Sequence, residues 1–304
     1  MVIALLGRIA DHEWAEALAE QLTQDALSDG DAFLTRARTR ATVHRFEDAL
    51  TDLDQAQRLG ADPRLVDAEC AAIFQAVGRY EQALTVYSEA VERRADFRFL
   101  ADLATLYAER GEVAAAETCF SESRARYRGV SPIPLAQLDF KRAQMWIAQG
   151  DLPRVRTWLE AAVGRLPAYA PAAGHLAEVE AALGETDSAI ARLRPLTRSS
   201  DDPDYAAQLA RILGEAGRLE EARAWRDRAA ARYDELVARH LEAYADHAAE
   251  FWLEAGANPH RALWFEGESR GPPTWRAHEL VARATRAGAG RAAHAVASTL
   301  EVVA

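Results

Sequence analysis

The sequence predicts an all-α protein, a right-handed α-α superhelix (solenoid) built from antiparallel helix pairs. A short pattern of a glycine, an apolar or aromatic residue, acidic residues and a small residue recurs along the 304 residues. The composition, with 49% hydrophobic and 27% charged residues, is rich in good helix formers. Runs typical of strands are missing. A recurring unit of this kind predicts stacked modules, so the length of the chain reflects the number of modules.

The recurring unit is clearest between Gly78 and Leu84, where a turn at Gly78 is followed by Tyr80, Glu81 and Ala83. We expect the turn to join two antiparallel helices, with the small residue opening the second helix. The positions equivalent to Tyr80 lie 34, 33, 39, 34, 33 and 39 residues apart and are Phe46, Tyr80, Val113, Leu152, Thr186, Leu219 and Asn258.

Residues 1–30 predict a half-repeat, or capping helix, before the regular units. The helix is expected over residues 11–27 with Asp11 as its N-cap, and Trp14, Leu18 and Leu22 recur at helical spacing.

Residues 31–267 predict a solenoid of about seven helix pairs, in which the two intervals of 39 residues have different origins. In the first, Gly129, Pro132 and Pro134 end a helix and add a loop. In the second, residues 219–255 contain neither Gly nor Pro, so a long helix is expected to bend near Arg239 and His240.

Residues 268–304 predict a degenerate repeat with capping helices. Apolar residues such as Leu280 and Leu300 would cover the open end of the stack.

Small residues mark where the paired helices would cross, because two helices approach closely only where their side chains are small. The period of about 34 residues and the small residues together resemble the tetratricopeptide repeat (TPR) family over residues 31–265. The resemblance implies a helical solenoid that binds other proteins, and Val155 and Thr186 depart from its pattern. The small residues before each turn are Ala37, Ala71, Ala104, Ala143, Ala177, Ala210 and Ala249.

The concave groove formed by the first helices of the units is the expected binding surface. A single asparagine, Asn258, occurs in the chain, so neither the asparagine ladder nor the C-terminal carboxylate clamp of many peptide-binding family members can be assembled. Basic groove residues could instead meet carboxylates of a partner. The predicted partner-binding residues are Arg38, Arg98, Asp102, Lys141, Gln144, His175, Arg211, Asp246, His247 and Glu250.

Charge and composition exclude several classes of function. The net charge of −11 is spread along the chain without a basic stripe, which argues against a nucleic-acid partner. Cys70 and Cys119 have no metal-ligand spacing, and no apolar run reaches the length of a membrane span. We expect a cytoplasmic protein that requires no cofactor, although a removed leader peptide would change that location.

The sequence carries no catalytic motif: there is no phosphate-binding loop, HExxH or GxSxG. Asp246, His247 and Glu250 have spacing that could hold a metal, but a solvated polar face is the better explanation, and no metal site is predicted. The tryptophans are expected to pack between helices, whereas Trp264 and Trp275, which flank a Gly-Pro-Pro loop, are candidates for exposed contact residues.

These observations predict a non-enzymatic scaffold or adaptor that holds another protein or a peptide segment in its groove. The alternative is a regulatory sensor, in which the solenoid binds a peptide or small ligand and controls an effector protein.

Overall fold

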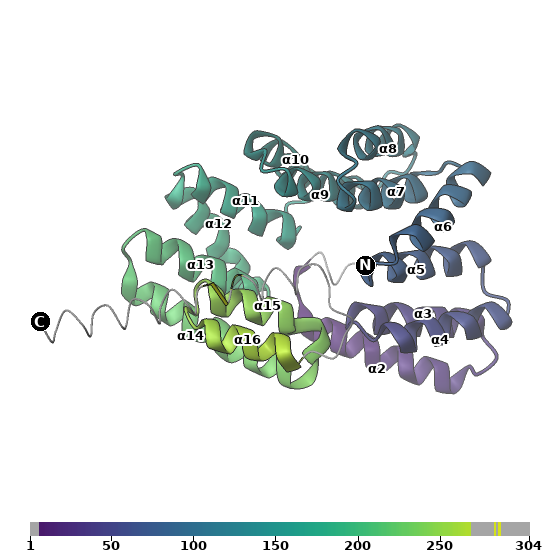
Figure 1. Cartoon of the computed structure of the whole chain (residues 1–304), viewed down its shortest axis with the longest axis horizontal. Helices are drawn as coiled ribbons and strands as arrows, with labels where there is room; N and C mark the ends of the chain where they lie inside the picture. The colour runs from purple at the N-terminus through teal and green to yellow at the C-terminus, as the bar shows by residue number, and fades with distance from the viewer. Residues whose placement is uncertain (1–5, 269–282, 284, 287–304) are drawn as a thin grey trace, which may run out of the picture. The chain divides into compact units, whose positions relative to one another are not determined.

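The computed structural model describes residues 6–268, 283, 285 and 286. Within this part, the chain forms α-helices and no strand, and helices that follow one another pack as antiparallel pairs (Figure 1). Two compact units can be distinguished, unit 1 over residues 1–201 and unit 2 over residues 202–304. The predicted all-α solenoid of helix pairs is therefore confirmed, while the division at residues 30 and 267 stays a prediction.

From Ile9 onward, unit 1 contains one single helix followed by five helix pairs. In each pair we call the helix that comes first along the chain the first helix and its partner the second helix. The helices of unit 1 are α2 (Ile9–Asp25), α3 (Gly30–Thr42), α4 (Phe46–Arg58), α5 (Pro63–Ala76), α6 (Tyr80–Arg93), α7 (Phe97–Glu109), α8 (Val113–Arg126), α9 (Ile133–Ala148), α10 (Leu152–Arg165), α11 (Ala170–Ala182) and α12 (Thr186–Ser199).

Unit 2 contains two helix pairs within the described residues: α13 (Pro203–Glu215) with α14 (Leu219–Arg239), and α15 (Leu241–Leu253) with α16 (Pro259–Glu268). Its core forms around the stacked rings of Tyr233 and Phe251, whose centroids lie 5.1 Å apart, together with the buried Phe265.

The second helices begin at the positions equivalent to Tyr80, from Phe46 to Leu219, which lie three residues before the small residue that was expected to open them. Each of these starts follows a turn in which a backbone N–H bonds to the carbonyl five residues earlier, as Arg79 does with Phe74. The turn residue is left-handed in every case, for example Gly78 with φ 76°. Glycine adopts this conformation without steric cost, which explains why it recurs at this place.

The small residues before the turns are buried at the crossings of the paired helices. Ala71, Ala104, Ala143 and Ala249 have no exposed surface, and Ala37, Ala177 and Ala210 are at most 4% exposed. Larger side chains such as Phe120 and Leu159 fill the space around them. The close approach of the helices that the sequence predicts is confirmed.

Both irregular steps of the repeat also have the predicted form. Residues 127–132 form a loop between α8 and α9, with Pro134 inside the first turn of α9, where proline is tolerated. The long helix α14 has 21 residues and ends at Arg239, and His240 leaves the helical conformation with φ −138°.

The N-terminal helix differs from the prediction in its start and in its cap. It begins at Ile9, and Asp11 lies inside its first turn, paired with Arg8 at 3.2 Å. The cap comes instead from Asp201 at the end of unit 1, whose carboxylate accepts the backbone N–H groups of Ile9 at 2.6 Å and Ala10 at 3.0 Å. A residue so far along the chain cannot be recognised as a cap from local sequence.

The prediction that the apolar face of α2 is buried was also wrong. Trp14, which was expected to pack between helices, is 65% exposed, and Leu18 and Leu22 on the same face are exposed as well. Two acidic residues of α2 pair with the next helix pair instead: Glu16 with Arg45, the N-cap of α4, and Glu20 with arginines of α3. Ion pairs therefore contribute to holding α2 against α3 and α4.

Of the other described tryptophans, some pack between helices and one is exposed, as the sequence analysis expected for the two groups. Trp146 is buried, and Trp158, Trp225 and Trp252 are partly buried against the cores of their units. Trp264 is 55% exposed, as its place near the loop suggested. Trp275 lies outside the described residues, as does the predicted capping segment 268–304 apart from residues 268, 283, 285 and 286.

No helix in the described part of the chain is both long enough and apolar enough to cross a membrane.

Candidate functional site

A hollow of about 1040 Å³ opens on the first helices of unit 1. Its lining comes mainly from α3, α5, α7 and α9, each of which contacts the next in the series. Because the first helices lie side by side, residues at equivalent positions of successive repeats are brought onto one surface. We call this surface the hollow.

Five of the predicted partner-binding residues line the hollow, and they come from three helices. Arg38 lies on α3, Arg98 and Asp102 on α7, and Lys141 and Gln144 on α9. Glu69 on α5, the helix between α3 and α7, lines the hollow too.

The charged residues of the hollow form a continuous series of ion pairs across the four helices. Glu69 accepts from Arg38 Nε and from an Arg98 terminal nitrogen, both at 2.9 Å. Arg98 Nε lies 3.7 Å from Asp102, and Lys141 Nζ lies 3.0 Å from the other oxygen of Asp102. Cations and carboxylates therefore alternate from α3 to α9, and each carboxylate orients two cations.

The ionisation of two groups at this surface is shifted by the surroundings. Burial disfavours the charged form of Arg98, but the hydrogen bond and charge of Glu69 outweigh it and raise the pKa of the guanidinium. Burial raises the pKa of Glu109, against the opposing effects of a hydrogen bond from Gln75 and the charge of Lys141.

Aromatic side chains form the apolar part of the hollow. Phe140 and Tyr169 meet edge to face with centroids 5.2 Å apart, and Phe97 lines the surface beside Arg98. The sequence prediction omitted Phe97 and Tyr169. Phe97 is the first residue of α7 and Tyr169 is the N-cap of α11, so neither falls within the helical periodicity used to identify groove positions.

The other five predicted residues do not line the hollow. His175 on α11 lies next to it, with its ring 5.6 Å from that of Phe140 and its Nδ1 2.9 Å from Glu178. The remaining four belong to unit 2, where Arg211 pairs with Glu215 along α13 and His247 lies 3.6 Å from Asp204. Glu250 lies 3.7 Å from Arg283. Asp246 is on α15 with His247 and Glu250.

A metal centre finds no support in the part of the chain that the structure describes. No group of three His, Cys, Asp or Glu side chains is arranged there to hold an ion, including Asp246, His247 and Glu250. The thiol of Cys70 is also expected to be unreactive, since burial raises its pKa to about 11 and so disfavours the thiolate.

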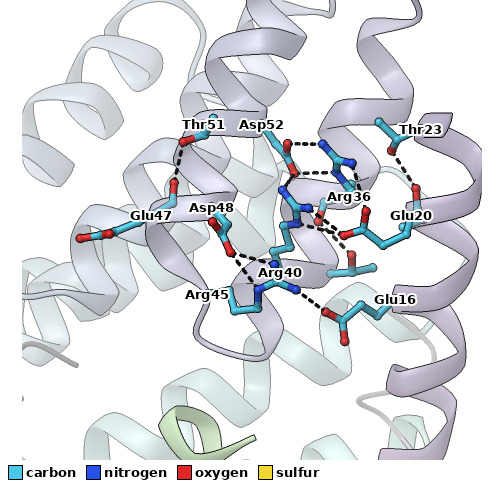
Figure 2. A network of polar contacts seen from close by, with 12 residues as sticks. Glu16, Glu20, Thr23, Arg36, Arg40, Arg45, Glu47, Asp48, Thr51 and Asp52 are labelled. Carbon is cyan, nitrogen blue, oxygen red and sulfur yellow. Dashed lines mark hydrogen bonds and ion pairs between the residues drawn. The ribbon is translucent and has the colours of Figure 1, made fainter. Parts of the chain in front are cut away.

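Buried ion pairs outside the hollow hold the helices together and so keep its lining in place. Figure 2 shows the cluster between α2, α3 and α4, in which Asp52 lies between Arg36 and Arg40 and both arginines reach Glu20. Burial opposes the ionisation of Glu20, but its hydrogen bonds with Arg40 and Arg36 and their charges outweigh burial and lower its pKa. These groups are structural, because their donors and acceptors are used within the cluster.

Comparison with known proteins supports the fold. Residues 147–212 match the sequence model of the tetratricopeptide repeat family. No curated protein matches the chain by sequence.

Solved structures with a similar fold share little sequence with this chain. They include human IFIT1, solved as a dimer with PPP-AAAA (17% identity, TM-score 0.57, 89% of this chain and 69% of that chain). The APC/C hetero-tetramer Cut9-Hcn1 matches at 14% identity and TM-score 0.51, over 92% of this chain and 47% of that chain, so this chain spans about half the length of that relative. A tetratricopeptide repeat protein from Parabacteroides merdae matches at 15% identity and TM-score 0.50, over 84% of this chain and 98% of that chain.

The repeat period, the buried alanines at the helix crossings and the left-handed turns occur along both units, beyond the residues that the family model matches. Residues 147–212 are therefore identified as tetratricopeptide repeat sequence, and the described chain as a whole has the fold of tetratricopeptide repeat proteins.

Proposed function

We propose that this protein is a non-enzymatic scaffold that holds a segment of another protein in the hollow of unit 1. Tetratricopeptide solenoids are in general scaffolds for protein interaction. The observation that carries the proposal is the hollow itself, which combines half-exposed charged side chains with aromatic walls on four neighbouring helices. A surface of this kind offers hydrogen bonds for specificity and apolar area for affinity.

The shape of the hollow favours an extended segment over a single small ligand. Its lining follows the series of first helices from α3 to α9, with Tyr169 beyond them. An extended chain could contact each helix in turn. The remaining predicted residues, His175, Arg211, Asp246, His247 and Glu250, stay candidates for contacts with the same partner.

A capture experiment with a matched control tests the proposal. The intact chain is compared with a double variant, Arg98→Glu and Lys141→Glu, in the hollow, and with a control, Arg93→Glu and Arg223→Glu. The control arginines are exposed and each pairs with a glutamate of its own second helix, so the change in net charge is the same. Bound proteins from native cell extract are identified by mass spectrometry, and circular dichroism checks that all three proteins fold.

We expect that the intact chain and the control variant both capture a partner protein, and that the hollow variant does not. A partner captured equally by all three proteins would contradict the placement of the site. Capture of no protein by the intact chain, together with saturable binding of a small molecule, would favour the alternative, a regulatory sensor.

A further inference from the structure

The cations of the hollow are exposed, whereas the carboxylates that pair with them are largely covered. The side chains of Arg38, Arg98 and Lys141 are 40%, 47% and 34% exposed, and those of Glu69 and Asp102 are 19% and 20% exposed. The carboxylates therefore lie beneath the cations, and the surface that a partner meets is cationic. With three cations and two carboxylates, the series has a charge of +1 in a chain whose net charge is −11.

The three cations keep N–H donors that their ion pairs do not use. Arg38 bonds Glu69 through Nε, and this bond does not use its two terminal nitrogens. Arg98 donates to Glu69 through one terminal nitrogen, with its Nε 3.7 Å from Asp102, and Lys141 bonds Asp102 with one of its three N–H groups. Each cation can accordingly bind a further carboxylate without losing the one beneath it, and such charge-assisted bonds are the stronger kind.

Lys141 is the only lysine in the sequence, and all other basic residues of the chain are arginines. Its compact ammonium group has three donors that rotate freely, so it accepts a carboxylate from several directions. The residue next to it, Phe140, belongs to the aromatic wall with Tyr169. An apolar side chain beside a carboxylate would therefore be bound at this end of the hollow.

The shared carboxylates indicate the spacing of the cations. Arg38 Nε and an Arg98 terminal nitrogen both lie 2.9 Å from the same oxygen of Glu69, so these two nitrogens are at most about 6 Å apart. Arg98 Nε and Lys141 Nζ lie 3.7 Å and 3.0 Å from the two oxygens of Asp102, so they are close neighbours too. Side chains of an extended segment alternate in direction and the chain rises about 3.3 Å per residue, so carboxylates at every second residue would lie about 7 Å apart on one face and match this spacing.

We propose that the hollow recognises an extended acidic segment of another protein, with carboxylates for Arg38, Arg98 and Lys141 and an apolar side chain for the wall of Phe140 and Tyr169. This inference rests on the proposed function and adds the chemical class of the partner.

Three fluorescent peptides of about 12 residues, long enough to cross the four helices, test this chemistry. All carry the same alanines and one phenylalanine. They differ only in having glutamate, glutamine or lysine at the three spaced positions. Binding is measured by fluorescence anisotropy with the intact chain, the hollow variant and the control variant described above. Because the chain has one lysine, acylation of Lys141 by an amine reagent, read by mass spectrometry, reports independently on where the peptide binds.

We expect the glutamate peptide to bind at least about tenfold more tightly than the glutamine peptide, and to weaken as salt rises. It should slow the acylation of Lys141, lose affinity in the hollow variant and retain it in the control. Equal binding of the three peptides, or binding that leaves Lys141 acylation unchanged, would overturn the inference.

Failure of the inference can be told from failure of the proposed function. If no peptide binds but the captured partner still depends on Arg98 and Lys141, the scaffold function stands and the acidic chemistry is wrong. If capture does not depend on the hollow either, both proposals fall.

Discussion

Arg36 and Asp52 form a two-pronged ion pair between α3 and α4, with Arg36 Nε 3.0 Å from one carboxylate oxygen and a terminal nitrogen 2.7 Å from the other. Asp52 is only 2% exposed. A carboxylate buried to this extent requires partners that satisfy its charge, and Arg40 supplies the second one (Figure 2). The fold of the first repeat therefore depends on a polar cluster as well as on apolar packing.

Replacement of Asp52 by alanine is expected to destabilise unit 1 by about 2–4 kcal/mol, because two partly buried guanidinium groups lose their partner. The lowered urea midpoint of the full chain measures the effect. Asp48→Ala is the control, since Asp48 pairs with Arg45 in an exposed setting and should cost less than about 1 kcal/mol. Similar losses in both variants would show that burial of the pair is unimportant.

Replacement of either of two glycines by alanine should change the stability of the protein, in opposite directions for the two sites. Gly150, in the turn between α9 and α10, has φ 69°, so Gly150→Ala should cost about 1 kcal/mol through backbone strain alone, as no atom crowds the new methyl group. Gly164 lies inside α10 without positive φ or close neighbours, and Gly164→Ala should stabilise by about 0.5–1 kcal/mol. Thermal unfolding of both variants checks this, and a shift in the same direction would contradict it.

Ala143 has no exposed surface at the crossing of α9 and α10. Ala143→Leu should destabilise the protein by about 1–3 kcal/mol, because three added carbons must force the helices apart. The same change at the exposed Ala114 of α8 should stay within about 0.5 kcal/mol. Denaturation midpoints distinguish the two sites, and tolerance of leucine at Ala143 would disprove the crossing argument.

The first turn of α2 should respond to acid through His12. Burial is the main cause that lowers its pKa from 6.5, against the opposing charges of Asp11 and Asp201. Folding therefore favours the neutral ring, so the contribution of His12 is complete above about pH 6.5 and is lost as the pH falls below it. The hydrogen-exchange protection factors of α2, which correct for the intrinsic pH dependence of amide exchange, should therefore fall on acidification.

In the His12→Gln variant, the part of this acid response that belongs to His12 should disappear, whereas His260→Gln, at an exposed site, should leave it unchanged. An identical pH dependence in all three proteins would assign the response to other groups.

Much of the architecture was determined by the sequence alone. The repeat predicted the turn before each second helix from α4 to α14, the buried alanines at the crossings, the loop after α8 and the bend after Arg239. These features are local: a turn needs a residue that accepts positive φ, and a crossing needs a small side chain. Both requirements repeat with the period of the fold, so they are visible in a single chain.

Tertiary structure alone decided how distant residues combine. Asp201 caps a helix that begins 192 residues earlier, and Glu69 aligns two arginines from other helices. It also decided that Phe97 and Tyr169 belong to the hollow and that Trp14 is exposed. Sequence periodicity gives the side of a helix on which a residue lies, but pairing across helices depends on three-dimensional distance and burial. Those quantities exist only once the helices have packed.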